Sequence, residues 1–260
     1  MSAAIENLGQ APSGMTSAEW QARCDLAACY RLVDFYGWSD FFGTHISLRI
    51  PGTEHFLLNP LGMLFDEITA SSLIKVDHNG NALSDSQYSI NPAGFTIHSA
   101  IHMSSQRLNA VVHTHTRAGN AVACMKEGLL PLHQKALIIL GFVAYHDYES
   151  VALDLGERER IVNDLGDKRI LILRNHGLMT VGETVGEAFL WMSRIETVCR
   201  YQLDALSCGR ELQELSGEVQ AHVVQQGVEI FGSGGLESGA GYWPAMLRKL
   251  ERETGPGWMI

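Results

Sequence analysis

The stretch NAVVHTHTRAG, residues 109–119, decides the expected fold of this chain. Its apolar residues lead into two histidines, His113 and His115, which are separated by one threonine. Side chains two residues apart on a β-strand lie on the same face, so both imidazoles project to one side of a short, buried strand. The small residues of 118–125 then indicate a helix that packs closely on this strand. A buried strand followed at once by a helix is typical of an α/β fold.

The alternation of strands and helices continues on both sides of this stretch. Upstream, Thr16-Ser17-Ala18-Glu19 fits a capping box at the start of a helix, and residues 44–50 alternate as a strand does. Downstream, residues 168–182 predict a buried strand that ends at His176-Gly177. Residues 184–206 form the longest expected helix. We therefore predict one α/β domain with a central, largely buried sheet.

The remaining segments complete the predicted organisation. Asn91-Pro92 opens a helix that reaches about residue 107, the run 136–148 predicts more strand, and Asn79-Gly80 predicts a hairpin turn. No repeat and no long linker divides the chain. We expect three parts: a flexible N-terminus at residues 1–15, the α/β domain at residues 16–208, and a polar helical extension packed on the same domain at residues 209–260.

The composition narrows the class of protein. The chain has 260 residues, 46% of them hydrophobic and 18% charged, as expected for a globular protein. The net charge of −10 argues against nucleic acid or an anionic membrane as a partner. No apolar run of about 18 residues predicts a membrane span. The first residues lack a basic region followed by an apolar stretch, so no secretory signal is expected and the predicted location is the cytoplasm.

Three histidines are the candidate metal ligands. His113 and His115 form a His-x-His pair at the end of a strand, a common source of two ligands for a transition metal. His176 is the natural third ligand, because it lies at a strand-to-turn corner. The competing interpretation is that all three are strand-end side chains satisfied by backbone groups. His98 and His102 share a helix face without the glutamate of an H-E-x-x-H motif, so we interpret them as packing or supporting residues.

With these residues in view, the chain resembles the class II aldolase/adducin family. The resemblance covers about residues 18–206 and is carried, in the family's order, by GTHISLRI, LLNPLGMLFDEITASSLIKVDHNG, NPAGFTIHSAIH, NAVVHTHTRAGNAVACMKEGLLPL and LRNHGLMTVGETVGEAF. It implies a three-layer α/β/α sandwich with a mostly antiparallel central sheet. It also implies a homotetramer with sites between subunits, a small-molecule substrate, and a divalent metal held by His113, His115 and His176. Zinc is the first expectation, with Fe(II) or Mn(II) as alternatives.

The chain departs from the sugar-phosphate aldolases of that family at the residues that handle substrate. Those enzymes carry Ser-Ser-Glu, with the glutamate as acid/base, where this chain has Pro92, Ala93 and Gly94. The asparagine of their phosphate-binding turn is replaced by His45, and their proton-donating tyrosine would fall near Gln134-Lys135. These departures argue against a sugar phosphate and favour a keto or hydroxy acid.

Three functions follow from these observations. The first is a metal-dependent, aldolase-like lyase that works through a metal-stabilised enediolate, with His98, His45 or Tyr148 as the group that moves the proton. The second is a non-haem iron oxygenase or decarboxylase of an aromatic keto or hydroxy acid. The third is a non-catalytic, adducin-like assembly module. The animal adducins of this family are membrane-skeleton proteins with a basic terminal segment, and RETGPGWMI here contains no basic run.

Overall fold

A computed structural model describes residues 11–151, 154–232 and 241–260. Within these ranges the strands form one seven-stranded sheet in the order β3-β2-β1-β4-β7-β6-β5. The strands are β1 (His45–Arg49), β2 (Phe56–Leu58), β3 (Ile74–Val76), β4 (Ala110–Thr114), β5 (Val143–His146), β6 (Ile170–Leu173) and β7 (Gly177–Gly182). All neighbouring pairs are antiparallel except β5 and β6, which are parallel. The prediction of a mostly antiparallel sheet is therefore confirmed.

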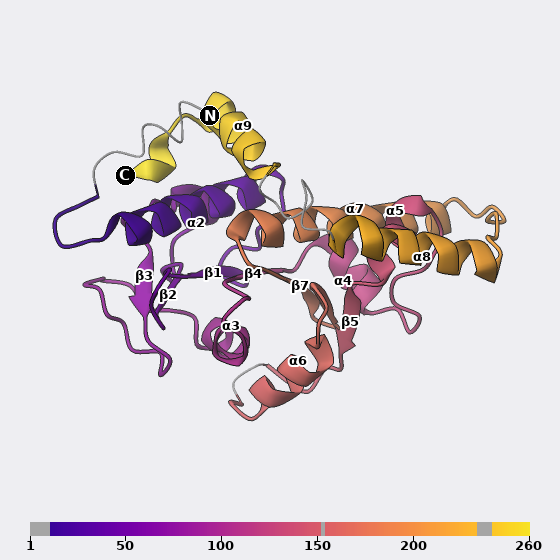
Figure 1. Cartoon of the computed structure of the whole chain (residues 1–260), viewed down its shortest axis with the longest axis horizontal. Coiled ribbons are helices and arrows are strands. Elements are labelled where there is room, and N and C mark those ends of the chain that lie inside the picture. The colour runs from indigo at the N-terminus through magenta and orange to yellow at the C-terminus, as the bar shows by residue number, and fades with distance from the viewer. Residues whose placement is uncertain (1–10, 152–153, 233–240) are drawn as a thin grey trace.

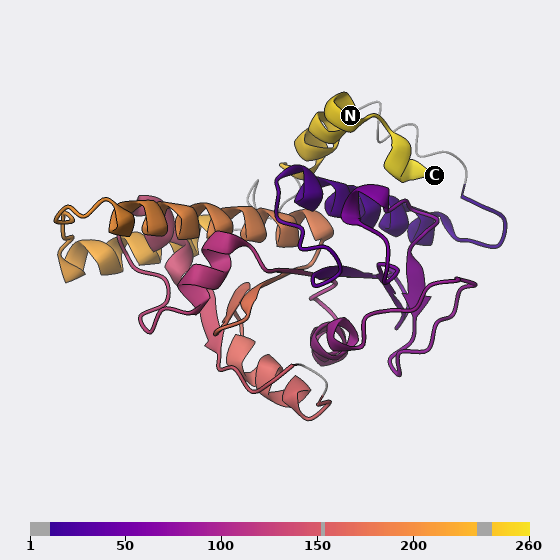
Figure 2. The same ribbon diagram turned by 180° about the vertical axis from the view of Figure 1, so that it is seen from behind.

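Helices cover both faces of this sheet. They are α2 (Ser17–Phe35), α3 (Pro92–Ser104), α4 (Arg117–Ala123), α5 (Gln134–Leu140), α6 (Glu157–Leu165), α7 (Val185–Ser207), α8 (Gly217–Gly232) and α9 (Trp243–Thr254), with short 3-10 turns at Phe65–Glu67 and Gly257–Met259. Figures 1 and 2 show α2 and α7 on one side of the sheet and α3 and α6 on the other. This arrangement is the predicted three-layer α/β/α sandwich.

Alternating side chains of the central strands feed two separate cores. Ile170 and Ile172 of β6 lie in the large core with α2, α4 and α7. Leu171 and Leu173 lie in the smaller core with α3 and α6. Because successive strand residues point to opposite faces, a strand buried on both sides must be apolar throughout. The uninterrupted apolar runs of the sequence are explained by this double burial.

Two predicted elements differ from the structure. Residues 136–140 belong to helix α5, and only Val143–His146 of the predicted strand 136–148 is a strand. A short apolar run has no periodicity that separates a buried helix from a buried strand, and α5 packs between α7 and α8. The predicted strand 168–182 is in fact β6 and β7, joined by a tight turn that ends at His176. Asn175 has a φ of 57° in this turn, a conformation that asparagine tolerates better than most residues.

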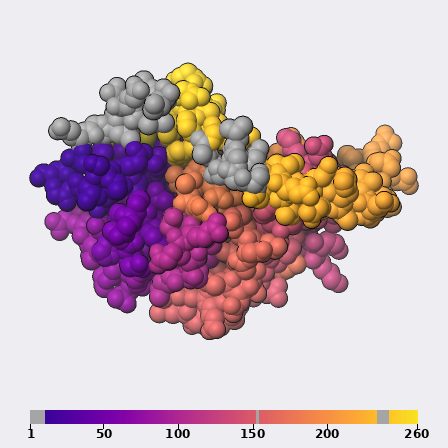
Figure 3. All heavy atoms as spheres, viewed as in Figure 1, coloured from indigo at the N-terminus to yellow at the C-terminus, as the bar shows by residue number. Residues whose placement is uncertain are grey.

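The described C-terminal helices pack on the α/β domain. Helix α8 lies against α5, and a side chain at Gly227 would come within 2.1 Å of the Ile138 carbonyl oxygen. Helix α9 lies against α2 and adds Leu247 and Leu250 to the large core. Figure 3 shows α8 and the end of α7 projecting from the body of the molecule. Residues 1–10 of the expected flexible N-terminus are outside the described ranges. None of the described helices is long and apolar enough to cross a membrane.

Candidate metal centre

The structure brings the three candidate ligands to one point at the end of the central strand β4. His113 is the last residue but one of β4, His115 follows the strand, and His176 ends the β6–β7 turn. One ring nitrogen of each lies within 4.8 Å of the others, and the Nε2 atoms of His113 and His115 are 2.9 Å apart. Three converging imidazoles are the donor set of a zinc site that keeps a position open. Among the described residues this is the group of side chains that fits a metal ion.

The Nδ1 atoms of His113 and His115 lie at hydrogen-bonding distance from two oxygen atoms outside the triad. His113 Nδ1 lies 2.9 Å from the carbonyl oxygen of Leu178, to which only an N–H can donate. His115 Nδ1 lies 3.1 Å from a carboxylate oxygen of Asp40. Both contacts place the proton on Nδ1, so each Nε2 keeps its lone pair for a ligand bond. Such partners orient metal-binding histidines and raise their basicity.

Burial favours the neutral form of the imidazoles of His113 and His176. Burial lowers the pKa of His113 well below its usual range, and the neighbouring rings of His45 and His176 lower it further. Burial also lowers the pKa of His176 to about 4, with His115 as the next cause. A metal ion binds the neutral form of imidazole, so no proton has to leave these two rings at neutral pH. The residues present therefore fit a divalent transition metal.

Gly177 is required at the corner that carries the triad. A side chain at this position would place its Cβ 2.6 Å from the carbonyl oxygen of Thr114 and 2.9 Å from Cδ2 of His115. Replacing Gly177 with alanine is expected to lower the free energy of unfolding by about 1–3 kcal/mol, because backbone or ring must shift. Urea unfolding measures this change. Gly217→Ala is the matched control, since nothing lies within 4 Å of its Cβ, and an equal loss in both variants would contradict the close packing.

His45 lies beside the triad without joining it. It is the direct antiparallel partner of His113 in the sheet, and the two ring centroids are 4.9 Å apart. Its Nδ1 lies 2.8 Å from Nε2 of His98, and Nδ1 of His98 lies 2.6 Å from Oγ of Ser47. The same hydroxyl is 2.7 Å from Nε2 of His102. His98 and His102 thus belong to a buried chain of hydrogen-bonding groups that runs from His45 through Ser47.

The side chain of His45 fills the space that Gly94 leaves. A Cβ on Gly94 would lie 2.7 Å from Cδ2 and 2.8 Å from Cγ of the His45 ring, which is closer than such atoms approach. A glutamate at position 94 and a histidine at position 45 therefore exclude each other in this backbone. Gly94 and His45, which are separate departures in the sequence, are in contact in the structure, where the missing side chain of one makes room for the ring of the other.

Tyr148 lines a small cavity together with His176, His146 and Glu157, and its side chain is 55% exposed. His146 is buried, with Nδ1 2.7 Å from a carboxylate oxygen of Asp164 and Nε2 3.3 Å from one of Glu157. The other carboxylate oxygen of Glu157 is buried and has no hydrogen-bond partner among the described residues. These groups make the cavity beside the triad polar.

Sequence reasoning missed the two carboxylates beside His146. The segment ERERIVNDLG reads as a charged surface helix, and Glu159, Arg160, Asn163 and Asp164 are indeed exposed. Glu157 and Asp164 are seven residues apart, which puts them on one helical face, and that spacing was the available signal. Their partner His146 lies on a different element, β5, so the pattern within one helix could not identify it.

Comparisons with known proteins agree with the fold. The family model described as "Class II Aldolase and Adducin N-terminal domain" matches residues 24–203. A Caulobacter vibrioides protein named for aldolase class 2 is 54% identical over 245 residues, which cover 94% of either chain. Alpha-adducin of Rattus norvegicus is 47% identical over 189 residues, 71% of this chain and 26% of that protein.

Two solved structures extend the comparison to the whole fold. An aldolase II superfamily protein from Pseudomonas syringae superposes with a TM-score of 0.89 at 48% identity, covering 95% of this chain and 98% of that one. An L-fuculose 1-phosphate aldolase from Glaciozyma antarctica superposes with a TM-score of 0.80 at 27% identity, covering 98% of each chain. The same overall architecture is thus found in chains that share between 27% and 48% of their residues with this one.

Proposed function

The chain belongs to the class II aldolase/adducin family, and we propose that it is a metal-dependent lyase acting on a small, non-phosphorylated keto or hydroxy acid. The observation that carries the proposal is the convergence of His113, His115 and His176, with outer nitrogens of two rings already engaged. Zinc is the proposed metal, because three imidazoles and an open position suit it. When bound, it would supply Lewis-acid stabilisation of negative charge that develops on a substrate oxygen.

We assign the movement of the proton to His45. Its ring occupies the volume next to Gly94 and adjoins His113, so it reaches the region where a substrate would react. His98 holds Nδ1 of His45 at 2.8 Å and is itself fully buried, so it acts as a positioning residue. Tyr148, which lines a cavity together with His176, is a second proton carrier.

The residues around Gly94 favour a substrate without phosphate. Pro92 and Ala93 offer no hydroxyl, and the Asn91 side chain is occupied by capping the backbone N–H groups of Ala93 and Gly94. A phosphate needs several donors or a cation to offset its charge. These side chains provide no cation and no hydroxyl, and the one donor, Asn91 Nδ2, already donates to the carbonyl oxygen of Phe42. A carboxylate and an adjacent oxygen need only the metal position and neighbouring donors. This composition supports a keto or hydroxy acid.

The first experiment measures metal and turnover on the same preparation. The protein is purified without a chelating column, its metal is determined by elemental analysis, and short keto and hydroxy acids are screened for carbon–carbon cleavage and for oxygen uptake. About one zinc per chain with cleavage would support the lyase. Iron with oxygen uptake on an aromatic keto acid would replace the lyase by the oxygenase. Absence of bound metal would refute both enzyme proposals.

The similarity to alpha-adducin favours one other candidate, a non-catalytic assembly module. In that case the metal would hold the β4 end and the β6–β7 turn together without turnover. The readout is the oligomeric state by light scattering with and without a chelator. We propose a cytoplasmic homotetramer for either function, and exposed apolar residues on α8, Val219 at 46% and Val228 at 39%, support an assembled form.

The contact between His115 and Asp40 supplies a graded test of the metal site. Asp40→Ala removes the carboxylate that holds Nδ1 of His115. Metal affinity is expected to fall by about 10–100-fold, the usual cost of losing such a partner. Competition with a chelator of known affinity measures it. Asp85→Ala, which removes an exposed carboxylate far along the chain, should leave the affinity unchanged. Equal affinities in both variants would show that Asp40 does not support the metal.

A further inference from the structure

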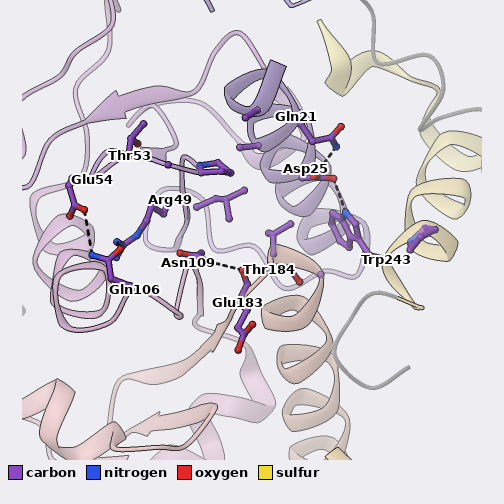
Figure 4. A pocket seen from close by; sticks show the side chains of 18 residues that line it. Gln21, Asp25, Arg49, Thr53, Glu54, Gln106, Asn109, Glu183, Thr184 and Trp243 are labelled. Atoms are coloured by element: carbon purple, nitrogen blue, oxygen red, sulfur yellow. Dashed lines mark hydrogen bonds between the residues drawn. The ribbon is translucent and has the colours of Figure 1, made fainter. Parts of the chain in front are cut away.

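A second, larger cavity lies at the opposite end of the central strands, where β1 ends and β4 begins. It has a volume of about 740 Å³ and is lined by α2, the end of β1, and the starts of β4, α7 and α9 (Figure 4). Asn109 lines it, whereas His115 lies six residues further along the strand, roughly 20 Å away. None of the triad, His45 or His98 contributes to its lining. The cavity has the size of a small-molecule site and is separate from the candidate metal centre.

One wall of the cavity carries the carboxylate of Asp25, which has no cationic partner among the described residues. Asp25 of α2 accepts hydrogen bonds from Trp243 Nε1 at 2.8 Å and from Gln21 Nε2 at 2.9 Å (Figure 4). Both donors are neutral, and burial raises the pKa of Asp25. An ionised carboxylate in a partly buried site is costly without a positive partner. This wall therefore offers a place for a positive charge.

The cation on the opposite wall does not serve Asp25. Arg49 is only 4% exposed and donates to Gln106 Oε1 at 2.9 Å and to the carbonyl oxygens of His102 and Ser105. These acceptors belong to the last turn of α3 and the segment after it, so the guanidinium holds that region to the end of β1. Its two terminal nitrogens both donate within the protein, whereas Nε has no hydrogen-bond partner among the described residues. Arg49 is the one cationic side chain among the described lining residues.

The other two lining acids already have partners. Glu183 pairs with Arg107 at the surface, and Glu54 lies 3.0 Å from Nε2 of His78. The two described partners of Asp25, the indole N–H of Trp243 and the amide of Gln21, are both uncharged. Next to it, the indole of Trp243 packs against Gly186, where a Cβ would come within 2.7 Å of the Trp243 Cβ. Leu48, Ala22 and Val185 add apolar lining.

We propose that this cavity binds a small organic cation, an amine with an apolar or aromatic body. Its ammonium group would sit on Asp25, and its body would pack against Trp243, Leu48 and Val185. An ammonium close to a tryptophan ring gains cation–π attraction in addition to the ion pair. The proposal does not depend on the function of the triad.

Isothermal titration with phenethylamine tests the site in the purified protein. Saturable binding of one molecule per chain is expected. The matched probe 3-phenylpropionate has the same ring but a carboxylate, and it should bind at least about tenfold more weakly, because it would meet Asp25. Absence of phenethylamine binding, or a preference for 3-phenylpropionate, would overturn the proposal.

Variants locate the binding in the cavity. Asp25→Asn keeps the shape and the acceptor for Trp243 but loses the charge, and should weaken phenethylamine binding by at least about tenfold. Ala18→Trp, at an exposed lining position, should block the cavity without touching the core. Asp85→Asn, which neutralises an exposed carboxylate outside the cavity lining, is the control and should bind as the parent does. Equal affinity for Asp25→Asn and the parent would contradict the assignment.

One further variant separates this site from the metal centre. An amine can also bind a metal directly, so phenethylamine is titrated into the His113→Ala, His115→Ala double variant. Retained affinity places the amine away from the triad, as proposed. Loss of binding in this variant, with Asp25→Asn unaffected, would assign the amine to the metal centre instead.

Discussion

Replacing both His113 and His115 with alanine is expected to remove the bound metal and to reduce lyase turnover by at least about 1,000-fold, since several kcal/mol of Lewis-acid stabilisation would be lost. The two side chains contribute two of the three converging nitrogens, and His176 alone cannot hold an ion tightly. Elemental analysis gives the metal content, and initial rates on the substrate found by screening give the turnover. The expected content falls from about one metal ion per chain to none.

The control for this double variant is His78→Ala. His78 is paired with Glu54 on the far side of β1 and is not part of the triad. It should keep both metal and turnover. A double variant that retains a full complement of metal would disprove the assignment of the ligands. A variant that loses metal yet keeps its turnover would leave the metal site standing and remove it from the reaction.

Replacing Gly94 with glutamate is expected to destabilise the protein strongly and to create no aldolase. The new Cβ would overlap the His45 ring, so one of the two must move, and a carboxylate would enter a buried region. Overpacking alone costs about 1–3 kcal/mol, and a poorly solvated carboxylate adds to it. Urea unfolding measures the loss, and cleavage of a sugar phosphate measures the activity.

A double-mutant cycle tests the link between the two positions. His45→Asn removes the ring that Gly94 accommodates, so Gly94→Glu should cost less in the His45→Asn background. We expect a coupling energy of at least about 1 kcal/mol, as is found for residues in direct contact. Additive effects would mean that His45 does not occupy the space at Gly94. Recovery of sugar-phosphate cleavage in the double variant would identify these two positions as the substrate switch.

The sequence was sufficient to predict the pair His113 and His115, because their common face depends only on the pattern of one strand. Alternation along a strand puts His113 and His115 on one face, whatever the rest of the chain does. The structure has both at the end of β4, with His176 nearby in the β6–β7 turn. The cap at Thr16 also follows from local pattern, since its side chain accepts the backbone N–H of Glu19 at 3.1 Å.

Elements whose state depends on neighbours were less predictable. Residues 136–140 could be helix or strand by their own pattern, and packing between α7 and α8 makes them helical. Residues 168–182 form two strands because Asn175 takes a left-handed conformation that turns the chain back. A single residue reverses the strand direction there, and apolar content alone does not reveal it.

The sequence by itself determined the α/β architecture and the shared face of the two histidines, since both depend on periodicity within single segments. Only the tertiary structure decided that His45 lies opposite His113 and fills the space at Gly94. It also decided that Glu157 and Asp164 flank His146, and that Asp25 faces a cavity far from the triad. These contacts join segments up to hundreds of residues apart, and strand register and side-chain packing, which bring them together, are properties of the whole fold.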